Sequence, residues 1–127
     1  MSKDIPGFSW TASASETIPA YRAVMLTSTA GQVSLTTGAT VHVVGIAQNA
    51  TTVGQAVTIV SSGISLMEAA ANTLVPGDKV TTDNAGKAVD GSTAGDAKVG
   101  ICLETGGAAG DYVAVLLSSP GSINAIT

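Results

Sequence analysis

The sequence has 127 residues, enough for one domain, and 45% of them are apolar, which is sufficient for a hydrophobic core. Only 11% are charged, and acidic residues outnumber basic ones nine to five, so the composition excludes a basic nucleic-acid-binding protein and a highly charged disordered chain. The single cysteine, Cys102, excludes a disulfide-stabilised scaffold.

The first 17 residues show no periodicity of apolar residues, but they contain two of the four aromatic residues, Phe8 and Trp10. In an extended chain, residues i and i+2 point to the same side about 7 Å apart, so these two rings would form a pair of anchors. Large aromatic side chains are common hot spots of protein interfaces. We expect residues 1–17 to form an extended N-terminal arm that docks on another chain. The alternative is that the two rings fold back and plug one end of the chain's own barrel.

The rest of the chain is rich in short runs of Val, Ile and Thr that are separated by Gly, Asn and Asp, a pattern typical of strands and turns. The predicted strands are 23–28, 32–36, 41–47, 56–61, 64–68, 78–82, 87–90, 98–104 and 111–118. The longest apolar run, 112–117, is far shorter than the ~20 residues of a membrane-spanning helix. The first residues also lack the apolar core of a secretory signal. We therefore expect an all-β protein that is made in a cytoplasm and has no membrane partner.

The sequence indicates an internal repeat. Val44-Gly45-Ile46-Ala47 returns as Val99-Gly100-Ile101-Cys102, and further Pro, Gly and Val positions recur in the same order with offsets of 55 to 57 residues. Two such short units cannot each bury much apolar surface alone. We expect repeats at roughly 18–63 and 74–119 to pack as one small β-barrel or sandwich over residues 18–119, followed by a C-terminal tail at 120–127.

A search for catalytic and metal-binding residues finds little. His42 is the only histidine, and the repeat aligns Cys102 with Ala47, which favours a buried structural thiol. The aspartates lack the spacing of a calcium loop, and turn capping explains Asp78 and Asp111, each of which follows a glycine. The glycine runs are not followed by the Lys-Ser/Thr of a phosphate-binding loop. We expect no enzymatic activity, no cofactor and no metal.

The second unit carries four motifs in a characteristic order. They are P-G-D-x-V from Pro76, D-x-x-G-K from Asp83, V-G-x-x-x-E from Val99 and A-G-D-x-V-x-V-x-L from Ala109. This order resembles the small capsid decoration (cement) proteins of tailed bacteriophages. The first unit looks like the same pattern with its acidic turns replaced: Gln55 stands where an Asp is expected after Gly54, and Ala20-Tyr21 stands at the place of Gly77-Asp78. The resemblance covers about 100 residues, and its motifs are turn glycines and strand valines, so the order carries it.

The resemblance implies a non-enzymatic protein on the outer surface of the phage head, commonly a homotrimer, which clamps neighbouring major capsid proteins and contacts no nucleic acid. The candidate partner-binding residues are Ile5, Phe8, Trp10 and Tyr21. The alternative function is a host-recognition or carbohydrate-binding module of a phage fibre or spike. Such modules display Tyr or Trp platforms, and outside the arm only Tyr21 and Tyr112 are available. A biotinyl or lipoyl carrier is disfavoured because no lysine stands at the expected hairpin tip.

Overall fold

The computed structural model describes residues 5–70, 74–91, 98–106 and 108–118. These residues form eleven strands, and they contain no helix that could span a membrane. The strands are β1 (Ile5–Pro6), β2 (Ser9–Ala14), β3 (Ala23–Leu26), β4 (Gln32–Leu35), β5 (Val43–Ala47), β6 (Ala56–Val60), β7 (Gly63–Glu68), β8 (Lys79–Thr82), β9 (Ala88–Asp90), β10 (Gly100–Cys102) and β11 (Tyr112–Leu117). The nine predicted strands correspond to β3–β11, and the all-β fold class is confirmed. The predicted C-terminal tail lies outside the described residues.

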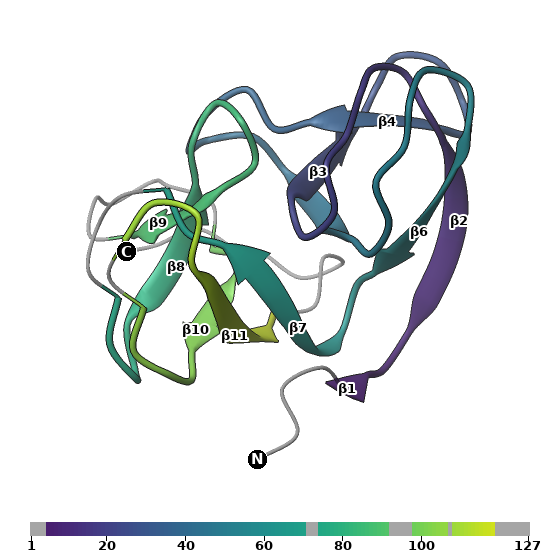
Figure 1. Cartoon of the computed structure of the whole chain (residues 1–127). Coiled ribbons are helices and arrows are strands. Elements are labelled where there is room, and N and C mark those ends of the chain that lie inside the picture. Colours follow the sequence, from purple (N-terminus) through teal and green to yellow (C-terminus); the bar gives the residue numbers. More distant parts are fainter. Residues whose placement is uncertain (1–4, 71–73, 92–97, 107, 119–127) are drawn as a thin grey trace.

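Strands β2 to β6 form a closed barrel with the order β2-β4-β3-β5-β6 (Figure 1). It closes because β2 pairs with β6 in the antiparallel sense and with β4 in the parallel sense. The small interior is filled by aliphatic side chains, which explains how a chain with few aromatic residues can pack it. The buried residues of this core are Ala12, Ala14, Ile18, Val24, Val33, Ala47, Val57 and Ile59.

The remaining strands form a six-stranded sheet with the order β1-β7-β11-β10-β8-β9. Its core contains Met67, Leu74, Val80, Val113 and Val115 among others, and it also includes Ala23 and Ile46 from the barrel. Because barrel residues complete this second core, the two sheets share a buried boundary.

The two sheets have the same strand pairing. If β7 to β11 are equated with β2 to β6, each pair of hydrogen-bonded neighbours in the barrel has its counterpart in the second sheet. The pair that closes the barrel, β2 with β4, corresponds to a single parallel bridge between Ala69 and Ala88. Each unit therefore begins one strand earlier than the predicted bounds of 18–63 and 74–119, because β2 and β7 are the first strands of the two units.

The prediction of an arm outside the β body is wrong for the described part of residues 1–17. Residues 9–14 form β2, a strand of the barrel, and residues 5–6 form β1, which pairs with β7. The reason is that the inward side chains of β2 include Ala12 and Ala14, while its other positions are mainly Ser and Thr. A strand that alternates Ser and Thr with Ala has almost no contrast in hydrophobicity, so the pattern that predicts strands is missing. The predicted end of the β domain at residue 119 lies outside the described residues and stays a prediction.

Strands β1 and β2 and strands β6 and β7 form one long antiparallel ribbon that runs from the barrel into the second sheet (Figure 1). The register is unbroken from Ser13 paired with Ala56 to Ile5 paired with Ile64. Between the strands, the N–H of Gly7 donates to the carbonyl of Ser62 at 2.9 Å, and the N–H of Ser61 donates to the carbonyl of Phe8 at 2.9 Å. The ribbon thus ties the two sheets together.

Candidate partner-binding surface

Trp10 packs against its own barrel. Its ring lies partly buried against the first core, and its Nε1 donates a hydrogen bond of 2.8 Å to Ser61 Oγ. The Ser61 hydroxyl in turn donates to the carbonyl of Val44 at 2.6 Å. These contacts hold the indole in place within the chain, as the folding-back alternative expects, and a role of Trp10 in binding a partner stays a prediction.

Phe8 is exposed to solvent although its backbone is fixed. The side chain is 63% exposed, while its N–H donates to Ser62 Oγ at 2.8 Å. A large apolar ring on an ordered backbone loses little conformational entropy when a partner buries it. Ile5 lies three residues earlier in β1, where it pairs with Ile64. Ile5 therefore lies at the edge of the second sheet, and Phe8 lies in the ribbon that connects the barrel to this sheet.

Tyr21 adopts a backbone conformation that is unfavourable for its residue type. It is the one non-glycine residue in the described part of the chain with a positive φ, of 64°. Its N–H donates to the carbonyl of Ala47 at 2.7 Å, just as the N–H of Gly77 donates to Cys102 at 2.8 Å in the second unit. Tyr21 thus occupies the position of Gly77, and the alignment that placed it at Asp78 is wrong by one residue. The left-handed conformation costs a tyrosine about 1–2 kcal/mol.

The strained Tyr21 places its ring against Tyr112. The ring centroids are 5.4 Å apart with an interplanar angle of 73°, an edge-to-face contact, and Tyr112 is 52% exposed. Next to this pair, Arg22 Nε and Nη2 donate to Glu68 at 3.3 and 3.2 Å, and Lys87 Nζ lies 3.6 Å from the same carboxylate. Since Arg22 belongs to the first unit and the other two belong to the second, this ion cluster joins the units.

The outer face of the second sheet carries aliphatic side chains. Ser65 and Met67 of β7 point inward, so Ile64 and Leu66 lie on the outer face, where Ile64 pairs with Leu116 of β11 and Leu66 pairs with Ala114, which is itself buried. Leu116 is 47% exposed and pairs on its other side with Ile101 of β10, which is partly exposed. Sequence reasoning missed this surface because the run 112–117 is apolar at nearly every position and does not show which side faces solvent.

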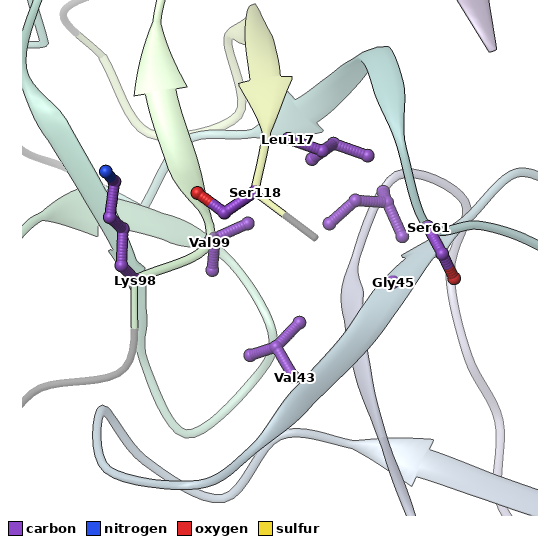
Figure 2. A pocket seen from close by; sticks show the side chains of 8 residues that line it. Val43, Gly45, Ser61, Lys98, Val99, Leu117 and Ser118 are labelled. Atoms are coloured by element: carbon purple, nitrogen blue, oxygen red, sulfur yellow. The ribbon is translucent and has the colours of Figure 1, made fainter. Parts of the chain in front are cut away.

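A small pocket lies at the boundary between the units (Figure 2). Val43, Val99 and Leu117 surround it, with Lys98 and Ser118 at its margin. Its volume of ≈ 10 Å³ is room for about one water molecule. It is too small for a saccharide or an organic cofactor.

The residues that were considered for catalysis or metal binding are engaged in contacts within the fold or lie apart from one another. The thiol of Cys102 is buried in the second core and donates to the carbonyl of Glu104 at 2.9 Å, and burial raises the pKa of this thiol. Asp78 Oδ2 and Asp111 Oδ2 accept backbone N–H groups at 3.0 and 3.2 Å, which confirms the prediction of turn capping. His42 is exposed just before β5. Within the described ranges, no group of three or more His, Cys, Asp or Glu side chains could hold a metal ion.

Comparison with known proteins gives the family of the chain and a solved structure with the same fold. The family described as phage cement protein matches residues 4–117, so the chain belongs to the phage cement protein family, a family of non-enzymatic capsid proteins. A solved structure described as the head fiber gp8.5 N base in bacteriophage phi29 has the same fold, with a TM-score of 0.70 and 19% sequence identity. The match covers 94% of this chain and 98% of that one. No curated protein matches the chain.

Membership of this family makes the protein a component of the phage capsid. The resemblance to cement proteins that the motif order indicated is therefore confirmed, as is the prediction that the chain is not an enzyme.

Proposed function

We propose that the protein is a capsid decoration protein that binds the outer surface of the phage head and stabilises contacts between neighbouring major capsid proteins. The match to the phage cement family over residues 4–117 is the observation that carries this proposal. The composition supports it, because a chain with only 11% charged residues can pack closely against protein without desolvating many charges.

The proposed partners are the major capsid protein and further copies of this chain, arranged in threes as the sequence resemblance implies. The surface offers several apolar side chains for such contacts. Phe8 and Leu116 are exposed, and Tyr112 is held next to the strained Tyr21. Exposed apolar groups of this size are typical of interaction sites when they occur together.

The residues proposed for attachment are Ile5, Phe8 and Tyr21, with Phe8 as the strongest candidate because its ring is exposed. Trp10 is assigned a supporting role, since its indole orders the ribbon in which Phe8 lies. Deleting residues 1–17 would remove a barrel strand, so the test must use point substitutions.

The experiment adds purified protein to expanded phage heads that lack it and measures occupancy per head across a titration, together with the temperature at which the heads rupture. The wild-type protein should bind saturably and raise that temperature. Phe8→Ala should weaken binding about tenfold, as expected when a large exposed ring at an interface is truncated.

Leu26→Ala is the matched control, because Leu26 is a large apolar side chain that is 57% exposed at the end of β3. It is not among the residues proposed for attachment. It should bind as the wild-type protein does. Absence of wild-type binding to the heads would overturn the proposed function, and equal losses in the two variants would overturn the role of Phe8.

The alternative of a carbohydrate-binding or host-recognition module depends on Tyr21 and Tyr112. Saccharides stack on open ring faces, whereas in the edge-to-face pair one ring directs its edge to the face of the other. The ion cluster beside the pair is also engaged within the chain. Decoration of the capsid is therefore the better-supported function.

A further inference from the structure

Three aliphatic side chains form a continuous row across the outer face of the second sheet. Ile64, Leu116 and Ile101 are direct cross-strand partners on β7, β11 and β10, and we call them the aliphatic row. Leu116 at its centre is 47% exposed. Directly opposed residues of a sheet project from the same face, so a partner could contact all three together.

In the first unit, two of the three corresponding positions are buried, and the third, Ser9, is exposed. Ser9, Val60 and Ile46 are cross-strand partners on β2, β6 and β5, the strands equivalent to β7, β11 and β10. Val60 is 2% exposed and Ile46 is fully buried, and Ile46 belongs to the core of the second unit. The same place in the repeat is therefore a packing surface in the first unit, and the second unit covers it.

The next pair of residues along the outer face differs between the two units. The aliphatic outer face of the second unit is therefore not a feature that the repeat imposes on both units. Thr11 pairs with Thr58 in the first unit, where the partly exposed Leu66 pairs with the buried Ala114 in the second. Thr11 and Thr58 are exposed, as expected for the solvated face of a half-buried sheet. At Leu66 the second unit therefore has a partly exposed aliphatic side chain where the first unit has the exposed hydroxyl of Thr11.

We propose that the aliphatic row is a docking surface for an uncharged, aliphatic surface of the capsid shell. This inference rests on the proposed function and adds to it a second contact, formed by the sheet face and distinct from Phe8. The chemistry of the occupant follows from the first unit, in which the equivalent Ile46 is buried in a cluster with aliphatic side chains such as Val99 and Val80.

The area of the row argues for the shell rather than a second copy of this chain as the occupant. Strands lie about 4.8 Å apart and residues on one face of a strand about 7 Å apart, so a row of three side chains over three strands covers on the order of 100 Å². Stable pairs of proteins bury about 800 Å² per partner. Two free copies would not be held together by this face alone, whereas a decoration protein that also attaches elsewhere gains affinity from each small contact.

The test measures the affinity of Leu116→Glu for expanded heads that lack the protein. The substitution places a charge at the centre of the row, and we expect binding to weaken tenfold or more. Thr58→Glu is the control, since it adds the same charge to the outer face of β6, the equivalent strand. It should bind like the wild-type protein. Leu116→Ser provides a milder second variant if the thermal unfolding of Leu116→Glu shows a loss of folding.

The outcomes separate this inference from the proposed function. If the wild-type protein does not bind heads, the proposed function is overturned. If the wild-type and both Leu116 variants bind with equal affinity, only the docking role of the row is overturned. Sedimentation velocity without heads gives the third outcome: a wild-type oligomer that Leu116→Glu dissociates would show that a second copy occupies the row and would overturn the assignment to the shell.

Discussion

Gly86→Ala should destabilise the protein more than the same change at Gly31, its counterpart in the repeat. Both glycines end a turn with nearly the same backbone angle, a φ of +75° for Gly86 and +79° for Gly31. Their surroundings differ. A Cβ on Gly86 would lie 2.6 Å from the carbonyl oxygen of Ala23, whereas a Cβ on Gly31 would meet nothing within 4 Å.

The two variants share the cost of a left-handed alanine, about 1–2 kcal/mol. Gly86→Ala adds an overlap with the carbonyl oxygen of Ala23. This oxygen belongs to the backbone of β3 and cannot rotate away. Separating the two segments also stretches the hydrogen bond of 2.8 Å from Ala23 N–H to the Gly86 carbonyl. Overpacking of this kind costs about 1–3 kcal/mol, so we expect Gly86→Ala to be less stable than Gly31→Ala by about 2 kcal/mol.

Urea denaturation and thermal unfolding of both variants measure this difference. For a chain of this length, about 2 kcal/mol corresponds to a difference of about 7 °C in Tm. The urea m-value should be the same in both, because the surface exposed on unfolding does not change. Equal stability of the two variants would refute the inference that the turn at Gly86 is packed against the first unit.

Two further predictions concern Tyr21 and Cys102. Tyr21→Gly should be more stable than Tyr21→Ala by about 1 kcal/mol in urea denaturation, because both lose the ring contact with Tyr112 but only alanine keeps the left-handed strain; the reverse order would contradict the strained backbone. Burial raises the pKa of the Cys102 thiol and so favours its neutral form in the folded protein. The neutral thiol of Cys102 therefore contributes fully to the free energy of unfolding below the ordinary thiol pKa. This contribution is lost as the pH rises through the raised pKa of the folded protein. A disulfide reagent should react with Cys102 much more slowly in the native protein than in urea at neutral pH, and equal rates would show that the thiol is accessible.

Most of the fold could be predicted from the sequence because the strands β3 to β11 contain Val, Ile or Leu between turn residues. The repeat was visible in the Val-Gly-Ile motif, since Gly45 and Gly100 are places where a side chain would collide with neighbouring atoms. A Cβ on Gly100 would collide with the carbonyl of Leu116, so the strand requires glycine there. Strand β2 could not be predicted in the same way, because Ala12 and Ala14 contribute its buried side and alanine carries little strand signal.

The candidate surface was predictable only in part. An exposed Phe8 agrees with the expectation of an anchor, but the separate environments of Phe8 and Trp10 depend on Ser61, which is 51 residues distant from Trp10 in the sequence. The aliphatic row required the register of three strands, since Ile64, Leu116 and Ile101 become neighbours only after the sheet has formed.

The ribbon of β1 and β2 paired with β7 and β6 has an unbroken register, and this has a mechanical consequence. In an antiparallel pair the hydrogen bonds run perpendicular to the strands. A force that pulls the N-terminal end along β1 and β2 therefore loads the bonds from Ile5 to Ser13 together, in shear, instead of opening them one after another. Because β6 and β7 are the opposing strands, the load reaches both units at once. A protein anchored near Phe8 would thus resist the expansion of a pressurised shell as one body.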